Sequence, residues 1–142
     1  MADRKATAVW NGGIMDGKGK VALGSGLFEG AYSFATRMGE DPGTNPEELL
    51  GAALAGCYAM ALNATLERGG TLPKQVDVAA NVHLGKDDAG FVIKGIDLVA
   101  KVDVDGIKND AFQVIAEEVK SACPISKALG GTKITLTATL VG

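Results

Sequence analysis

The chain has 142 residues, of which 46% are apolar and 22% are charged, and its formal net charge is −3. This composition is typical of a soluble globular protein with a packed core, and the length suits one domain over residues 1–142. The slight negative charge, without any basic run, argues against nucleic acid as a partner.

The first 44 residues predict short strands followed by a loop. Residues 4–10, 19–25 and 27–34 have the pattern of strands, and the charged, Pro- and Gly-containing stretch 35–44 is expected to form a loop. The glycines between residues 17 and 26 lack the spacing of a phosphate-binding loop, and no helix follows them directly. They are therefore expected to serve turns or bulges rather than a nucleotide.

A long helix is predicted over residues 46–68. Asn45 suits the N-cap position, Pro46 suits the first helical position, and Glu48 falls where a capping box places its acidic residue. Gly69-Gly70 follows the last helical residue, as a helix C-terminus favours. The signals at both ends therefore agree with one uninterrupted helix.

The middle of this helix carries no charge on any face between Leu49 and Leu62, so we expect it to be buried on all sides. It is rich in Ala and Gly and is expected to be too short for a membrane span. Small residues allow another backbone to approach closely, and a chain of this size has little material to surround such a helix. We therefore expect a subunit interface along the small residues at positions 52, 55, 56 and 59.

The remaining residues predict a hairpin, two helices and a last strand. Residues 76–84 alternate as a half-buried strand, and Asp87-Asp88-Ala89-Gly90 predicts the hairpin turn. The apolar positions of the return strand change parity across Gly95, which predicts a β-bulge there. A helix is expected from Lys108 or Asn109 to Ala122, a short helix from Cys123-Pro124 to about Leu129, and a strand over 133–141.

These elements follow the order βββ-α-ββ-α-α-β, with a long buried central helix. Such an order is typical of an α+β fold rather than of an alternating βαβ parallel sheet. The core is expected to contain the aromatic residues Trp10, Phe34, Phe91 and Phe112.

Most familiar catalytic and metal-binding patterns are absent. The two cysteines and the single histidine lack the spacing of a zinc site, and no G-x-S-x-G motif is present. His83 falls on the polar face of its strand and is expected to be a solvated surface residue. We therefore expect neither a metal nor another cofactor.

The cysteines, Cys57 and Cys123, are the remaining candidates for chemistry. Cys57 lies in the apolar helix, where it suits a small core residue and where burial raises the pKa of a thiol. Cys123 precedes a helix, whose dipole favours a thiolate. From the residues alone, Cys123 is the better nucleophile, and Cys57 competes only if a fixed positive charge such as Arg37 reaches it.

No export signal precedes the first strand, so the cytoplasm is the expected compartment. Thiols are kept reduced there unless they are catalytic, which makes a permanent structural disulfide the less favoured role for the pair.

The segment 44–62, Thr-Asn-Pro-Glu-Glu-Leu-Leu-Gly-Ala-Ala-Leu-Ala-Gly-Cys-Tyr-Ala-Met-Ala-Leu, closely resembles the osmotically inducible protein C (OsmC) family of hydroperoxide reductases. Further matches are residues 32–37, Asp88-Ala89-Gly90-Phe91 and Cys123-Pro124-Ile125-Ser126-Lys127, so the resemblance covers nearly the whole chain. The chain is more similar to the OsmC branch than to the organic hydroperoxide resistance branch, because Arg37 falls shortly before the long helix.

The resemblance implies a role for each of four residues. Cys57 matches the peroxidatic cysteine and Cys123 the resolving cysteine. Arg37 matches the arginine that activates the thiolate, and Glu47 matches the carboxylate that orients this arginine. A histidine is common in relatives where Leu54 stands here, so a more apolar pocket is expected.

The family fold implied by the resemblance is an intertwined α+β homodimer with two active sites at the interface. In the predicted helix Glu47 and Cys57 are ten residues apart, about 15 Å along the axis. Arg37 must therefore bridge this gap, or the partner chain must supply one of the two residues.

The implied activity is the reduction of organic hydroperoxides, and more weakly of hydrogen peroxide, in oxidative and osmotic stress defence. It would pass through a Cys57 sulfenic acid and a Cys57–Cys123 disulfide, which an external dithiol reduces. One alternative is a non-catalytic dimeric protein that binds a lipid-like ligand in its interface cleft. Another is a thiol redox sensor, although no DNA-reading or partner-docking element supports it.

Overall fold

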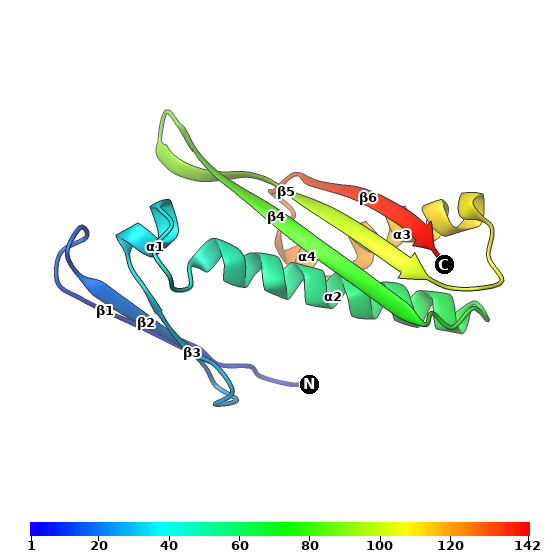
Figure 1. The fold of residues 1–142 in the computed structure, drawn as a ribbon, viewed down its shortest axis with the longest axis horizontal. Helices are drawn as coiled ribbons and strands as arrows, with labels where there is room; N and C mark the ends of the chain where they lie inside the picture. Colours follow the sequence, from blue (N-terminus) through cyan, green and yellow to red (C-terminus); the bar gives the residue numbers. More distant parts are fainter. The chain divides into compact units, whose positions relative to one another are not determined.

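In a computed structural model, which describes residues 1–142, the chain forms two compact units, Met1–Leu49 and Leu50–Gly142. The boundary falls within helix α2 (Pro46–Arg68), so the first turn of this helix belongs to the first unit. The element order is βββ-α-α-ββ-α-α-β (Figure 1). The predicted α+β class is therefore confirmed, with one additional short helix, whereas the single domain over 1–142 stays a prediction.

The first unit contains an antiparallel sheet in the order β1-β2-β3, formed by β1 (Ala6–Asn11), β2 (Lys18–Leu23) and β3 (Glu29–Tyr32). Gly19 of β2 is buried, and a Cβ atom at this position would overlap the Tyr32 ring. That ring packs against Trp10, with 5.5 Å between the ring centroids. This glycine therefore serves the close packing of two aromatic rings within the sheet.

A short helix, α1 (Phe34–Met38), occupies part of the stretch that was expected to be a loop. Its N-terminus is closed by a capping box, in which Thr36 N donates to Ser33 Oγ at 3.2 Å and Ser33 N donates to Thr36 Oγ1 at 2.8 Å. The two residues thus satisfy each other's free backbone donors. The loop prediction is wrong here, and Arg37 lies on a capped helix.

The second unit combines a three-stranded sheet with helices on one face (Figure 1). The sheet order is β4 (Gln75–Asp87), β5 (Gly90–Asp103) and β6 (Ile134–Val141), and the remaining helices are α3 (Asn109–Ala122) and α4 (Pro124–Ala128). Helices α2 and α3 meet over this face, where Tyr58 Oη donates to Ala116 O at 3.0 Å. The fully buried side chains include Leu54, Tyr58, Leu62, Leu66, Ile96, Ala100, Val102, Phe112 and Ala116.

The predicted hairpin and its bulge are confirmed. The turn joins Asp87 to Gly90, whose φ of +126° suits glycine. Further along, His83 pairs with Gly95 while its neighbour Leu84 pairs with Ile93. The residue between these two partners on β5 therefore has no partner on β4, which is the extra residue that the parity change across Gly95 predicts.

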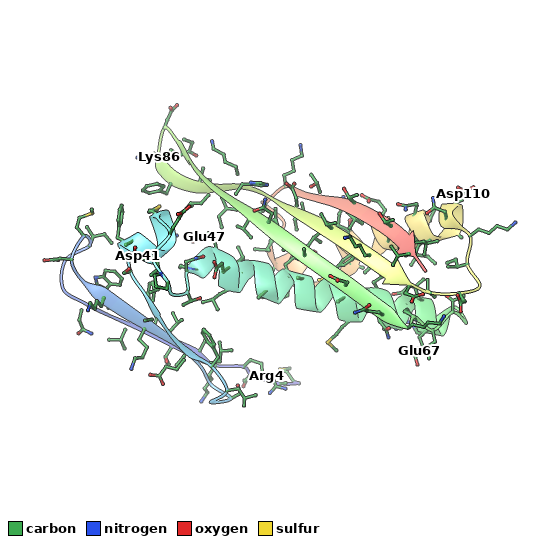
Figure 2. The ribbon with its side chains drawn as sticks, in the orientation of Figure 1. Arg4, Asp41, Glu47, Glu67, Lys86 and Asp110 are labelled. Atoms are coloured by element: carbon green, nitrogen blue, oxygen red, sulfur yellow. The ribbon has the colours of Figure 1, made fainter.

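The aromatic predictions have different outcomes. Phe112 is fully buried in the core, as expected, and Trp10 and Phe34 are half-buried. Phe91 is 54% exposed, and the ammonium group of Lys86 lies 4.7 Å from its ring centroid. Its assignment to the core is wrong, because it lies at the hairpin tip, where Figure 2 labels Lys86.

Strands β5 and β6 pair in parallel, whereas β4 and β5 are antiparallel. The connection between β5 and β6 passes through α3 and α4, as a parallel pair requires a crossover. The sheet is therefore mixed: the fold is not an alternating βαβ sheet, but it contains one parallel pair.

Helix α2 is buried on one face only within this chain. The face toward the sheet contains Leu54, Tyr58, Leu62 and Leu66, which are fully buried. The opposite side leaves residues 52, 53, 56 and 60 exposed. The expectation of burial on all sides is therefore wrong for the single chain, because the sequence has no polar face to mark which side points outward.

The length of α2 also corrects one expectation. With 23 residues, the helix is long and apolar enough to cross a membrane by length and composition alone. The prediction that the segment is too short for a span is wrong on that ground. Core helices of soluble proteins share these properties, so length and composition say nothing further about a membrane.

Candidate active site

The first candidate group is an ion pair in the first unit between Arg37, in the last turn of α1, and Glu47, in the first turn of α2. The Arg37 Nε donates to Glu47 Oε1 and Oε2 at 3.1 and 3.2 Å, and Nη2 donates to Oε1 at 2.6 Å. The hydrogen bonds to Glu47 raise the pKa of Arg37 above its ordinary value. The expected contact between these two residues is therefore present.

Exposure differs between the two partners. The Glu47 side chain is only 10% exposed, whereas that of Arg37 is 40% exposed. Figure 2 labels Glu47 at the start of α2, with Glu67 at the other end of the same helix. The carboxylate is thus a fixed, nearly buried anchor, and the guanidinium keeps a solvent-facing side.

Local capping explains why Glu47 is available for this contact. Asn45 Oδ1 accepts a hydrogen bond from Glu48 N at 2.8 Å, which confirms Asn45 as the N-cap of α2. Thr36 Oγ1 donates to Thr44 O at 2.8 Å and ties α1 to the residues before α2. Because these contacts cap and tether both helices without the Glu47 carboxylate, that carboxylate is free to hold Arg37.

The second candidate group is the pair of cysteines in the second unit. Cys57 lies in the middle of α2, and Cys123 lies where α3 ends and α4 begins. Their Sγ atoms are 2.6 Å apart, and neither is in a disulfide. A disulfide bond needs about 2.05 Å, so little movement separates these thiols from a covalent link.

Access to the two sulfurs is unequal. Cys123 is 0% exposed, whereas Cys57 is only half-buried. A small molecule that approaches from solvent therefore reaches the Cys57 sulfur first. This order could not be read from the sequence, in which Cys57 lies in the more apolar segment.

The pKa values of the two thiols shift in opposite directions. Burial raises the pKa of Cys57, and its contact with Cys123 raises it further. Burial also opposes ionisation of Cys123, but the neighbouring Cys57 thiol and the Ser126 and Ile125 backbone N–H groups at the start of α4 favour its thiolate, so its pKa falls below the ordinary value. Within this chain Cys123 is therefore the more acidic thiol, as the residues alone predicted.

Ser126 was not singled out for chemistry from the sequence. It lies in the first turn of α4, three residues after Cys123, and its hydroxyl also lowers the pKa of that thiol. Its Oγ is buried and has no complete hydrogen bond in the structure. The sequence feature that could have pointed to Ser126 is its position in the first turn of the short helix that follows Cys123-Pro124.

The only histidine of the chain forms a contact of its own. His83 is exposed, as predicted, and its Nε2 lies 2.6 Å from Asp97 Oδ2 on the neighbouring strand. Thr135 Oγ1 donates to the other oxygen of the same carboxylate. Leu54, three residues before Cys57 on α2, is fully buried in the core.

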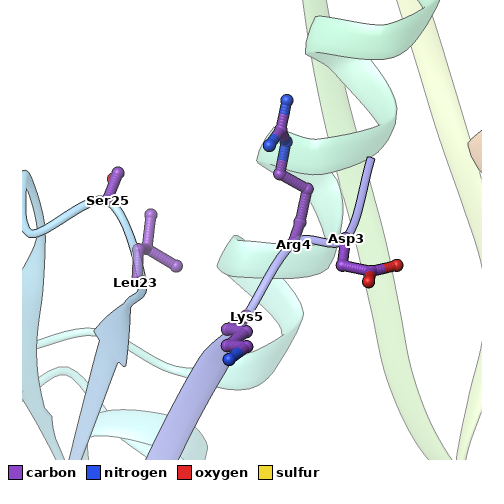
Figure 3. Close-up of a pocket in the computed structure, with 6 residues that line it drawn as sticks. Asp3, Arg4, Lys5, Leu23 and Ser25 are labelled. Atoms are coloured by element: carbon purple, nitrogen blue, oxygen red, sulfur yellow. The ribbon is translucent and has the colours of Figure 1, made fainter. Parts of the chain in front are cut away.

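A shallow pocket in the first unit contributes nothing to this chemistry. Residues 3–5 line it together with residues 23–25, and Figure 3 shows their side chains. These side chains include neither a thiol nor a histidine. No group of three or more His, Cys, Asp or Glu residues in the chain is arranged to hold a metal ion.

Comparison with known proteins agrees with this arrangement. Residues 39–138 match the family described as OsmC-like protein. The chain belongs to the OsmC-like family. It is 44% identical over 127 residues to the peroxiredoxin OsmC of Escherichia coli strain K12, which covers 89% of each protein.

Two further members of the superfamily are similar over much of the chain. The organic hydroperoxide resistance protein of Xanthomonas axonopodis pv. citri is 32% identical over 97 residues, or 67% of this chain and 66% of that protein. The crystal structure of an organic hydroperoxide resistance protein from Elizabethkingia anophelis has a TM-score of 0.78 at 26% identity. The match covers 100% of this chain and 97% of the other. The fold expected of an OsmC family member is therefore confirmed for the single chain.

Proposed function

We propose that this chain is a cysteine-based peroxidase that reduces organic hydroperoxides to alcohols. The observation that carries the proposal is the separation of 2.6 Å between a half-buried and a fully buried thiol sulfur. The names of its relatives, peroxiredoxin and organic hydroperoxide resistance protein, support the same reaction class. The proposed site consists of Cys57, Cys123, Arg37 and Glu47.

In the first step the Cys57 thiolate attacks the distal oxygen of the hydroperoxide. The O–O bond breaks, the alkoxide takes up a proton and leaves as the alcohol, and Cys57 becomes a sulfenic acid. We assign this step to Cys57 rather than to the more acidic Cys123 because Cys123 is 0% exposed. Access therefore decides which sulfur meets the substrate.

In the second step the Cys123 thiolate attacks the Cys57 sulfur. The S–O bond breaks, and hydroxide leaves and is protonated to water, so that a Cys57–Cys123 disulfide forms. The adjacent sulfurs favour this condensation, because the two reacting atoms are already side by side. An external dithiol then reduces the disulfide and is itself oxidised, which suits the reducing cytoplasm.

Ionisation of Cys57 needs help, since burial raises its pKa within this chain. We propose that Arg37 supplies the positive charge, lying beside the Cys57 sulfur of its own chain or of a second copy. Glu47 holds this guanidinium through three hydrogen bonds. A fixed cation in a partly buried site stabilises both the thiolate and the charge that develops on the peroxide.

The proposed working form is a homodimer. The exposed side of α2 supports it, because it presents small and apolar residues such as Ala52, Gly56 and Met60 to solvent. An apolar helix face of this kind is stabilised by burial against a second protein surface. Sedimentation equilibrium should give twice the chain mass, and a monomer at micromolar concentration would contradict this part of the proposal.

Two single-cysteine variants test the mechanism with one equivalent of cumene hydroperoxide. Cys57→Ser should consume none, whereas Cys123→Ser should consume one equivalent and stop at a sulfenic acid that dimedone traps. Full peroxidase activity in Cys57→Ser would overturn the assignment. The alternative, a non-catalytic protein that binds a lipid-like ligand, predicts no consumption by either variant.

A further inference from the structure

Ser126 is the one residue in the chain with a buried side-chain oxygen or nitrogen that lacks a hydrogen-bond partner. The residue is 7% exposed, so its hydroxyl is shielded from bulk solvent. Buried polar groups are almost always hydrogen-bonded, because an unpaired one loses its hydration without replacement. An orphan hydroxyl beside a reactive thiol therefore suggests a partner that exists only in another state of the site.

We propose that Ser126 is a positioning residue that donates its hydroxyl hydrogen to the Cys123 sulfur when that sulfur is a thiolate. The resolving role of Cys123 rests on the proposed function. The contact between Ser126 and Cys123 does not depend on that role. A thiolate is a strong hydrogen-bond acceptor, whereas a thiol or a disulfide sulfur is a weak one. Ser126 would therefore be satisfied in one redox and protonation state only.

The surroundings of Cys123 support this contact. Ser126 is the third residue of α4, and Cys123 is the N-cap residue of the same helix, so both lie in its first turn. Burial opposes ionisation of Cys123, yet the pKa of this thiol is lowered, and the hydroxyl of Ser126 is among the causes. The side chain and the backbone of one residue thus act on the same atom.

No nearby cation accounts for the lowered pKa of Cys123. The titratable group that faces the Cys123 sulfur is Cys57 on α2. On α3, Lys120 is paired with Glu117, and on α4 the side chain of Lys127 is exposed. The proposed stabilisation of the thiolate therefore comes from neutral donors.

The consequence concerns both halves of the redox cycle. In the oxidising half, Ser126 increases the share of Cys123 present as thiolate, which attacks the Cys57 sulfenic acid. In the reducing half, a thiolate of the external dithiol attacks the more accessible Cys57 sulfur, and the S–S bond breaks. The electron pair of that bond goes to Cys123, which leaves as the thiolate that Ser126 receives, while the attacking sulfur forms a mixed disulfide with Cys57. The second thiolate of the dithiol then attacks the reductant sulfur of this mixed disulfide, Cys57 leaves as a thiolate, and the dithiol ends as a disulfide.

The test is a thiolate titration by ultraviolet absorbance in a Cys57→Ala background, where Cys123 is the only thiol. Ser126→Ala should raise the pKa of Cys123 by about one unit, or about tenfold in its ionisation constant, as loss of one hydrogen bond to a charged group predicts. The matched control is Ser121→Ala, an exposed serine on α3, which should leave the value unchanged. An unchanged pKa in Ser126→Ala would overturn the proposal.

A second pair of variants separates the hydroxyl from its effect on packing. Ser126→Thr keeps the hydroxyl and Ser126→Val replaces it by a methyl group of similar shape, so only the valine variant should raise the pKa. An equal pKa of Cys123 in the threonine and valine variants would also overturn the proposal. If the Ser126→Ala variant does not fold, this pair takes its place in the test. Because no peroxide is used, failure here leaves the proposed peroxidase reaction intact, and failure of the peroxidase leaves this contact measurable.

Discussion

Removal of the charge on Glu47 gives the sharpest test of how Arg37 is held. Glu47→Gln keeps the shape of the side chain and one acceptor oxygen, but it removes the anion that Nε and Nη2 of Arg37 contact. The arginine is 40% exposed, so solvent screens the pair, and its contribution is about 1 kcal/mol. This free energy corresponds to about a fivefold fall in the equilibrium constant between correctly oriented and misoriented Arg37.

The expected result is a fall of about fivefold in kcat/KM with cumene hydroperoxide and a dithiol, since misorientation of Arg37 reduces the ionised fraction of Cys57. Urea unfolding should show a loss of about 1 kcal/mol in the same variant. The matched control is Glu48→Gln, an exposed neighbour whose carboxylate is in no ion pair and whose backbone N–H keeps its bond to Asn45. Equal activity of both variants and the unmodified protein would refute the reasoning.

Two further predictions concern stability. Leu62→Ala should lower the free energy of unfolding in urea by about 3 kcal/mol, because Leu62 is fully buried, whereas Val114→Ala on the exposed side of α3, outside the proposed dimer face, should change it by less than about 0.5 kcal/mol. Equal losses would contradict the assignment of the buried face. Hydrogen bonds from Thr135 and His83 hold the pKa of Asp97 below its ordinary 3.8. The ionised Asp97 therefore stabilises the folded state above pH 3.8, and this stabilisation is lost as the pH falls through the lower pKa that Asp97 has in the folded state. The deficit of Asp97→Ala in thermal unfolding should therefore disappear in strong acid, and a deficit independent of pH would count against this contact.

Elements whose pattern is local were predicted well from the sequence. The β4–β5 hairpin follows from period-two alternation and a turn ending in Gly90, and the parity change across Gly95 indicated the bulge. The start of α2 follows from Asn45, whose side chain caps the helix N-terminus. In each case the residues that determine the element lie within a few positions of one another.

Features that depend on tertiary contacts were missed. Helix α1 has only five residues, and its capping box uses Ser33 and Thr36 rather than the usual acidic partner. The buried side of α2 has no polar counterpart in the sequence that would identify it. Phe91 was assigned to the core from its aromatic side chain alone, although the predicted turn at residues 87–90 already placed it beside the hairpin tip, where it is exposed.

The candidate site was predictable only in part. The chemistry of Cys123 at a helix N-terminus could be inferred from the residues, and the resemblance to the OsmC family supplied Cys57, Arg37 and Glu47. The distance between the two sulfurs could not be inferred from the sequence, since 66 positions separate the cysteines in the chain. The orphan hydroxyl of Ser126 is visible only when the side chains around it are known.

The most direct test of the account is the mass of the unmodified protein after one equivalent of cumene hydroperoxide. The account predicts a loss of two hydrogens and, after proteolysis without reductant, one covalently linked pair of peptides that contain Cys57 and Cys123. An unchanged mass, with both thiols still open to alkylation after denaturation, would contradict it.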